Sequence, residues 1–190
     1  MRLWIALIAA SCAAQTPAVD RVLERYVDAL GGRAALEAVQ SRVAVGSVVS
    51  PTFGTWGEYA EQSRRPNLLA RGYRMERYGV VQKVFDGARG WYESPEYAVE
   101  TLAGARLAEL RREAEFDAPL KLRELYPNLN LRGRVRMFDQ DLTELVSTLP
   151  EGGEARLLFS EATGLLTAVI APETARGGRS RPVETWYEDY

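Results

Sequence analysis

The sequence predicts an α+β fold in which one long, strongly curved antiparallel β-sheet is covered by helices. Strand-length segments with alternating apolar and polar residues make up most of the chain. An amphipathic helix precedes these segments, and a second helical segment interrupts them. The connections between strands are too short for parallel crossovers, so neighbouring strands pair antiparallel. A sheet of this many strands curls, and both helical segments must bury their apolar faces against one side of it.

The first 14 residues have the layout of a signal peptide, with a positive charge at Arg2, an apolar run over residues 3–10 and small residues up to Ala14. The apolar run is too short to span a bilayer. Cleavage after Ala14 would leave residues 15–190, which we expect to form a single domain. In the alternative, the segment AASC is a lipoprotein signal that ends at residue 11, and Cys12 carries the lipid. Either signal predicts an exported protein, periplasmic or lipid-anchored through Cys12.

The first helix of the mature chain is predicted to begin at Pro17, with Thr16 as its N-cap. Apolar residues recur over residues 19–30 at the spacing of one helix face, and the pair Gly31–Gly32 ends the helix. This amphipathic helix is expected to lie on the sheet.

Strands follow over residues 42–50, 54–65, 67–78 and 80–87. The segment FDGARGWYESP, which contains Asp86–Gly87, has two interpretations: a glycine-rich loop that binds a ligand, or the tight turn of a β-hairpin. A phosphate-binding loop leads into a helix N-terminus, but no helical pattern begins at Trp91. We therefore predict a hairpin turn, where Asp-Gly supplies the positive φ.

Residues 101–127 form the second helical segment, which Pro119 divides. Its charged stretch ELRREAE places Glu109 at helical spacing from Arg112 and Glu113, which is typical of a solvated face with weak ion pairs.

Strands resume after residue 127. Arg132, Arg134 and Arg136 alternate with apolar residues, so we expect them on the solvated face of the sheet. Such a stripe can contact nucleic acid, but export and a net charge of −2 argue against a nucleic-acid partner. The remaining strands are predicted over residues 141–150, 154–160, 164–172 and 182–190.

The residues that the chain lacks exclude several chemistries. It has no histidine, and its one cysteine is Cys12. A zinc site of imidazole or thiolate ligands and a Ser-His or Cys-His nucleophile are therefore impossible in residues 15–190. No phosphate-loop or dinucleotide motif occurs either, so we expect no cofactor and no metal. Acid–base chemistry by paired carboxylates is the one enzyme class left open.

A curved sheet with helices across its mouth encloses an apolar hollow, and such hollows bind ligands. An acyl chain of about 14 methylenes would gain on the order of 11 kcal/mol if it were wholly buried, so a carrier need shield it only in part. Aromatic residues in the strands are the candidate cavity lining, with packing in an ordinary core as the alternative; they are Trp56, Tyr73, Phe85, Trp91 and Phe159.

Four segments, RYVDALGGRAALEAVQS, FDGARGWYESP, LRREAEFDAPLKLRELYP and LFSEATGLLTAVI, together carry a family resemblance. They resemble exported bacterial proteins of the outer-membrane lipoprotein-sorting type, relatives of the periplasmic lipoprotein carriers of the LolA type. The resemblance covers residues 19–190 and consists of turn and helix signatures rather than catalytic motifs. It implies a half-barrel of antiparallel strands whose concave side is covered by the helices.

Three functions remain open. The first is a non-enzymatic periplasmic binder or carrier of lipoprotein acyl chains or other hydrophobic ligands. The second is a lipid-sensing periplasmic regulator on the same fold, which would pass a signal to a membrane-protein partner. The third is a carboxylate-based hydrolase, which requires two carboxyl groups about 5–9 Å apart in one cleft. We expect a monomer that binds acyl chains and contacts any membrane protein only transiently.

Overall fold

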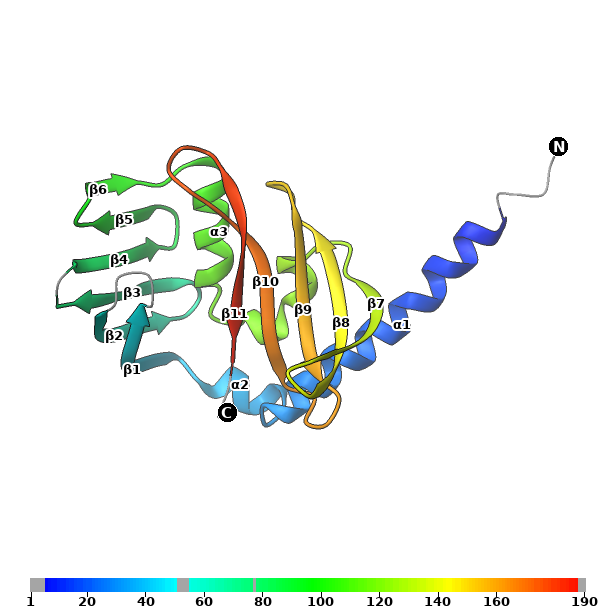
Figure 1. The fold of residues 1–190 in the computed structure, drawn as a ribbon. Coiled ribbons are helices and arrows are strands. Elements are labelled where there is room, and N and C mark those ends of the chain that lie inside the picture. The colour runs from blue at the N-terminus through cyan, green and yellow to red at the C-terminus, as the bar shows by residue number, and fades with distance from the viewer. Residues whose placement is uncertain (1–5, 51–54, 77, 188–190) are drawn as a thin grey trace. The chain divides into compact units, whose positions relative to one another are not determined.

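A computed structural model describes residues 6–50, 55–76 and 78–187 and has an α+β fold with two antiparallel sheets (Figure 1). The predicted α+β class and antiparallel pairing are confirmed, but the single continuous sheet is wrong. Strands β1 to β6 form one sheet in chain order, and β7 to β11 form the other. Helical segments separate β6 from β7 in the chain, and these two strands are not paired.

The chain divides into two compact units. An inserted unit spans Glu37–Ala118, and a split unit combines Met1–Leu36 with Pro119–Tyr190. The inserted unit contains the six-stranded sheet and helix α3. Its elements are β1 (Ser41–Ser50), β2 (Thr55–Arg64), β3 (Leu68–Met75), β4 (Gly79–Asp86), β5 (Gly90–Ser94), β6 (Tyr97–Thr101) and α3 (Gly104–Ala114).

The turn between β4 and β5 is a hairpin turn, as predicted. Gly87 has a φ of 99°, and the backbone amides of Ala88 and Arg89 donate hydrogen bonds to Oδ1 of Asp86 at 2.9 and 2.7 Å. The amides of Arg89 and Ala88 hold the pKa of the Asp86 carboxyl below its usual value. The Asp-Gly pair therefore has a complete structural role in shaping this turn.

Helix α3 packs against β4 and β5 to form the core of the inserted unit. Gly90 lets the helix approach closely, because a Cβ there would lie 2.7 Å from Cδ2 of Leu110 and 3.1 Å from Cδ1 of Leu107. The second glycine of FDGARGWYESP is thus a packing requirement. The buried residues of this core are Leu69, Phe85, Leu102, Leu110 and Ala114.

Ion pairs also attach the C-terminal end of α3 to the sheet. Glu113 forms ion pairs with Arg71, at 2.5 Å, and with Lys83, at 3.6 Å. Glu109 on the same helix is buried. The prediction that ELRREAE is a solvated face with ion pairs is therefore wrong for Glu109, which the helix turns toward the protein, whereas Glu113 is exposed and ion-paired.

The split unit contains the five-stranded sheet and the remaining helices. Its elements are α1 (Ala6–Ala29), α2 (Arg33–Ala38), a 3-10 turn η1 (Ala118–Leu120), α4 (Leu122–Leu125), β7 (Asn130–Met137), β8 (Gln140–Thr148), β9 (Glu154–Ser160), β10 (Leu166–Thr174) and β11 (Ser180–Trp186). The chain boundaries of the two units fall within α2 and η1.

Helix α1 packs on the five-stranded sheet as an amphipathic helix, which confirms that prediction. Val19 and Tyr26 are buried, and the ring of Tyr26 meets that of Phe159 edge-on with centroids 5.5 Å apart. Leu122 and Tyr126, at and after α4, complete the same core. The expectation that both helical segments cover one sheet is wrong, since α1 packs on the five-stranded sheet and α3 packs on β4 and β5 of the six-stranded sheet.

The start of α1 differs from the prediction. The helix begins at Ala6 and runs through Pro17, because the alanine-rich residues before Thr16 are strong helix formers. Residues 1–5 of the predicted signal peptide and the side chains of residues 6–17, including Cys12, lie outside what the structure describes. Within the described ranges, no helix is both long enough and apolar enough to cross a membrane.

Candidate functional site

The face of the six-stranded sheet opposite α3 is the candidate site. Side chains alternate between the two faces of each strand, and Leu69 and Phe85 are paired on the face that α3 covers. The residues that alternate with Leu69 and Phe85 along their strands, together with the residues paired with those, therefore lie on the opposite face, which we call the open face. One row of paired residues runs across it from β1 to β5: Val43, Gln62, Ala70, Val84 and Trp91.

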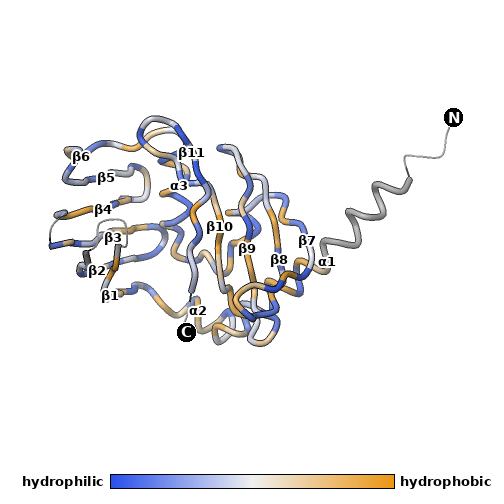
Figure 2. The backbone as a smooth tube through the Cα atoms, in the orientation of Figure 1, coloured by the Kyte–Doolittle hydropathy of each residue, from blue (hydrophilic) through white to orange (hydrophobic). Residues whose placement is uncertain are grey.

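The open face exposes large apolar side chains at its β1–β2 end. Val43, Val45 and Val49 are 72, 80 and 71% exposed, and Trp56, which pairs with Val49, is 59% exposed. Figure 2 shows apolar segments in β1 and β4 of this sheet. Clustered exposed apolar groups of this kind mark surfaces that bind a ligand or a partner.

A shallow cleft of about 340 Å³ lies over the middle of the same sheet. Small residues make its floor: Ala60 pairs with Gly72, and Gln62 pairs with Ala70. Gly72 admits no side chain, because a Cβ there would collide with the carbonyl oxygen of Val81. The volume is at the lower end of that of small-molecule sites.

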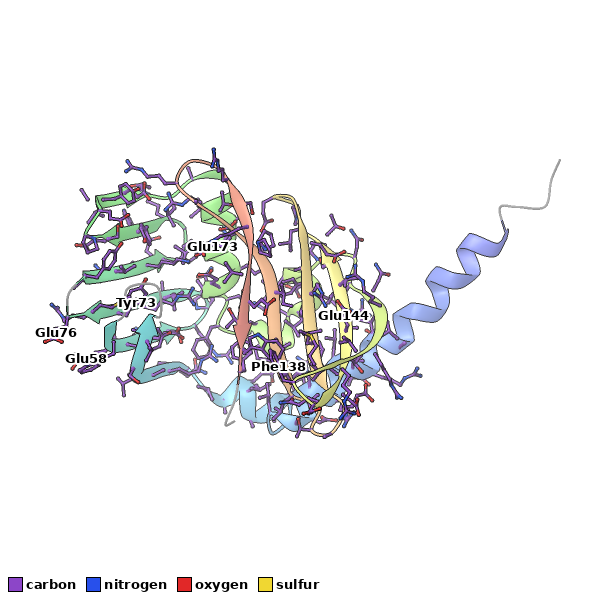
Figure 3. All side chains as sticks on the ribbon, in the orientation of Figure 1. Glu58, Tyr73, Glu76, Phe138, Glu144 and Glu173 are labelled. Carbon is purple, nitrogen blue, oxygen red and sulfur yellow. The ribbon has the colours of Figure 1, made fainter. Side chains whose placement is uncertain are left out.

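Polar side chains surround this floor. Glu58 of β2 lies opposite Arg74 of β3, and Figure 3 shows Glu58 and Tyr73 on these neighbouring strands. On the β4 side, Nε2 of Gln82 donates a hydrogen bond to Glu93 at 2.6 Å. An apolar chain on the floor would therefore have charged and amide groups within reach of a polar end.

Side chains on the opposite face of the same strands form structural hydrogen bonds. Tyr59 donates a hydrogen bond to Glu61 at 2.7 Å. Burial and this hydrogen bond raise the pKa of Tyr59 to about 12, so its hydroxyl stays protonated at neutral pH. A protonated tyrosine that already donates to a carboxylate is a structural group rather than a general base.

The structure brings two of the five predicted lining residues to the open face. They are Trp56 and Trp91, the latter half-buried beside Val84. Tyr73 lines the cleft from β3, although its register directs its side chain to the opposite face. Phe85 and Phe159 are 1 and 2% exposed and pack in separate cores.

Sequence reasoning did not identify the floor of the cleft. Ala60, Ala70 and Gly72 carry no signal individually, because small residues occur in many strands. Only the hairpin registers place Ala60 opposite Gly72 and both beside Ala70. The short turn between β2 and β3 could have provided that register, since hairpin loop length fixes which residues face each other.

The arginines of β7 are held by carboxylates. Arg132 contacts Glu154 at 2.5 Å and Arg134 contacts Glu161 at 3.3 Å. Arg136 also has carboxylate partners, Asp139 and Asp141. These ion pairs agree with the prediction of a solvated sheet face.

A groove beside α1 and α4 is lined by several carboxylates, and one of them, Asp20, accepts hydrogen bonds at 2.5 and 2.8 Å from Arg123. Among the described residues that line the open-face cleft, the one carboxylate is Glu58, and Glu93 lies beside the cleft through its hydrogen bond with Gln82. Among the residues that the structure describes, no three potential metal ligands cluster together.

No family model matches the chain, and no curated protein matches its sequence. The chain does resemble solved structures. An outer membrane lipoprotein-sorting protein domain from Vibrio parahaemolyticus is 11% identical over 83% of this chain and 75% of that one, with a TM-score of 0.45. A LolA superfamily protein from Nitrosomonas europaea is 14% identical over 85% of this chain and 73% of that one, with a TM-score of 0.45.

LprF from Mycobacterium bovis is 10% identical over 82% of this chain and 87% of that chain, with a TM-score of 0.36. The solved structures that resemble this chain thus include the group of proteins that the sequence motifs resemble. At such low identity and TM-score, this likeness carries no information about the function of the chain.

Proposed function

We propose that this protein is a non-enzymatic binder or carrier of an apolar ligand, such as the acyl chain of a lipid or lipoprotein, and that the ligand lies on the open face. The observation that supports this is the exposed apolar surface of β1 and β2, which adjoins a cleft floored by Ala60, Ala70 and Gly72 where Val45 pairs with Ala60. The predicted signal peptide supports a periplasmic location, either free or lipid-anchored through Cys12.

The shape of the site suits reversible binding. Burial of each methylene is worth about 0.8 kcal/mol, so a fully enclosed acyl chain would leave slowly. A shallow surface cleft covers one side of a chain and leaves the other side in water. Binding would then be strong enough for capture and weak enough for transfer to a membrane or to another carrier.

Binding of a fluorescent fatty-acid analogue tests this proposal. The wild-type protein should bind the analogue while folded. Ala60→Asp places a charge on the cleft floor, where an acyl chain would desolvate it, and should weaken binding by at least about tenfold. Ala60 is exposed, so the melting temperature should change little.

Val99→Asp is the matched control. Val99 is an exposed valine on β6, outside the lining of the cleft, so this variant should bind like the wild type. A folded wild-type protein that binds no analogue would contradict the proposal. So would equal weakening by Ala60→Asp and Val99→Asp, since binding would then not be localised to the cleft.

A further inference from the structure

The outer edge of β1 is a strand edge without a partner strand among the described residues. β1 is the terminal strand of the six-stranded sheet (Figure 1), and all ten of its residues, Ser41–Ser50, pair with β2 without a register shift. In an antiparallel pair, alternate backbone amides and carbonyls point away from the neighbouring strand. A long row of backbone donors and acceptors is thus available on the outer side.

β1 lacks the features that normally protect such an edge. Proteins protect edge strands with charges, proline, bulges or short length. The sequence SRVAVGSVVS has one charge, at Arg42, and no proline or lysine. Its valines at positions 43, 45 and 49 are more than two-thirds exposed.

The other terminal strands of the two sheets do have these features. β6 is five residues long. β7 carries Arg132, Arg134 and Arg136, and β11 contains Arg181 and Pro182. The unprotected edge of β1 is therefore an exception within this molecule, and a partner that pairs with β1 would explain it.

We propose, in place of the monomer expected from the sequence, that two copies of this chain associate through antiparallel pairing of their β1 strands, which joins their six-stranded sheets. The sequence of β1 is self-complementary about Gly46. In that register Val43 lies opposite Val49 of the partner subunit, and the single charge, Arg42, lies opposite Ser50 of the partner subunit. A two-fold axis repeats both pairs, so no like charges meet.

This complementarity favours a second copy over an unrelated peptide. Antiparallel pairing of two identical strands satisfies the same backbone groups on both subunits. Valine opposite valine on the open face also removes two exposed side chains per copy from water. The paired sheets would place the two open faces side by side. The dimer forms whether or not the proposed ligand is bound.

The mass of the protein in solution, measured by light scattering and sedimentation over a range of concentrations, tests this pairing. The wild type should be a dimer that dissociates on dilution. Val43→Glu combined with Val49→Glu places carboxylates opposite carboxylates and should raise the dimer dissociation constant by at least about tenfold. Both side chains are exposed, so circular dichroism and the melting temperature should stay close to wild type.

Two further variants test the register and the location. Val43→Lys combined with Val49→Glu places opposite charges across the same two pairs and should restore the dimer. Val99→Glu, on the opposite edge strand, should leave it unchanged. A monomeric wild type, a dimer that survives the paired glutamates, or no recovery with the lysine variant would each overturn the proposal.

Fatty-acid binding distinguishes this inference from the proposed function. If Ala60→Asp weakens binding of the analogue while the chain remains a dimer, the pairing and the ligand site are supported separately. A dimeric wild type that binds no analogue would support the pairing and contradict the proposed function. If the wild-type chain copurifies with a different protein along β1 instead of dimerising, the self-pairing is wrong.

Discussion

At Gly87 the backbone turns from β4 into β5 with φ in the left-handed region, at 99°. A β-branched residue is strained in that conformation, and a Cβ at this position would also lie 3.2 Å from Oδ1 of Asn67. Gly87→Val should therefore lower the free energy of unfolding by about 1–2 kcal/mol. Urea unfolding measures this change. Gly87→Asn should lower the free energy of unfolding by less, because Asn tolerates positive φ.

The same variant separates a structural turn from a ligand-binding loop. The folded Gly87→Val protein should bind the fatty-acid analogue as the wild type does, because Gly87 is outside the lining of the cleft. A variant of full stability that has lost the ligand would show that this turn is part of the binding site.

Among the elements, α3 and β5 depend on one close contact between Gly90 and Leu110. Gly90→Ala should destabilise the protein by about 1–3 kcal/mol through overpacking, and Leu110→Ala by about 2–5 kcal/mol through a cavity. The double variant should lose less free energy of unfolding than the two single variants lose together, because the added methyl group enters the space that Leu110 vacates. Strict additivity in a double-mutant cycle would show that α3 does not pack on Gly90.

Most elements could be predicted from periodicity alone, because alternation and helical spacing are local properties of the chain. β6 was missed, since Tyr97–Thr101 is short and directly precedes the helical segment. The division into two sheets was missed because it depends on whether β6 and β7 pair, which no local pattern records. Glu109 was misplaced for a similar reason, as its burial depends on packing against residues that are distant in sequence.

The candidate site shows where sequence reasoning ends. Alternation assigns Trp56 and Phe85 to strands but does not tell which face a helix will cover. In the structure Trp56 is mostly exposed and Phe85 is buried under α3. The aromatic residues therefore predicted the strands of the sheet but not the cleft. The cleft is formed by alanines and a glycine that become neighbours only when the strands pair.

At the scale of the whole molecule, the two units have separate hydrophobic cores. The core of the inserted unit comes from residues between Leu69 and Ala114. The main core of the split unit joins Val19 and Tyr26 to residues such as Leu145 and Phe159, from the other side of the insertion. The prediction that residues 15–190 behave as one domain stays a prediction, which a single cooperative unfolding transition would support.

The split core also determines an order of events on the ribosome. The inserted unit has every residue of its core once Ala118 has left the exit tunnel, whereas the helix containing Val19 must wait for β8 and β9 to be translated. Until then, the apolar stripe of the nascent α1 has no sheet to cover it, and it is a natural target for a chaperone. In pulse-labelled refolding, amides of β3 and β4 should gain protection before those of β8 and β9, because the core on β8 and β9 also needs α1 from the far side of the insertion, and that contact closes a longer loop. Simultaneous protection would mean that the inserted unit cannot fold before the segments that flank it meet.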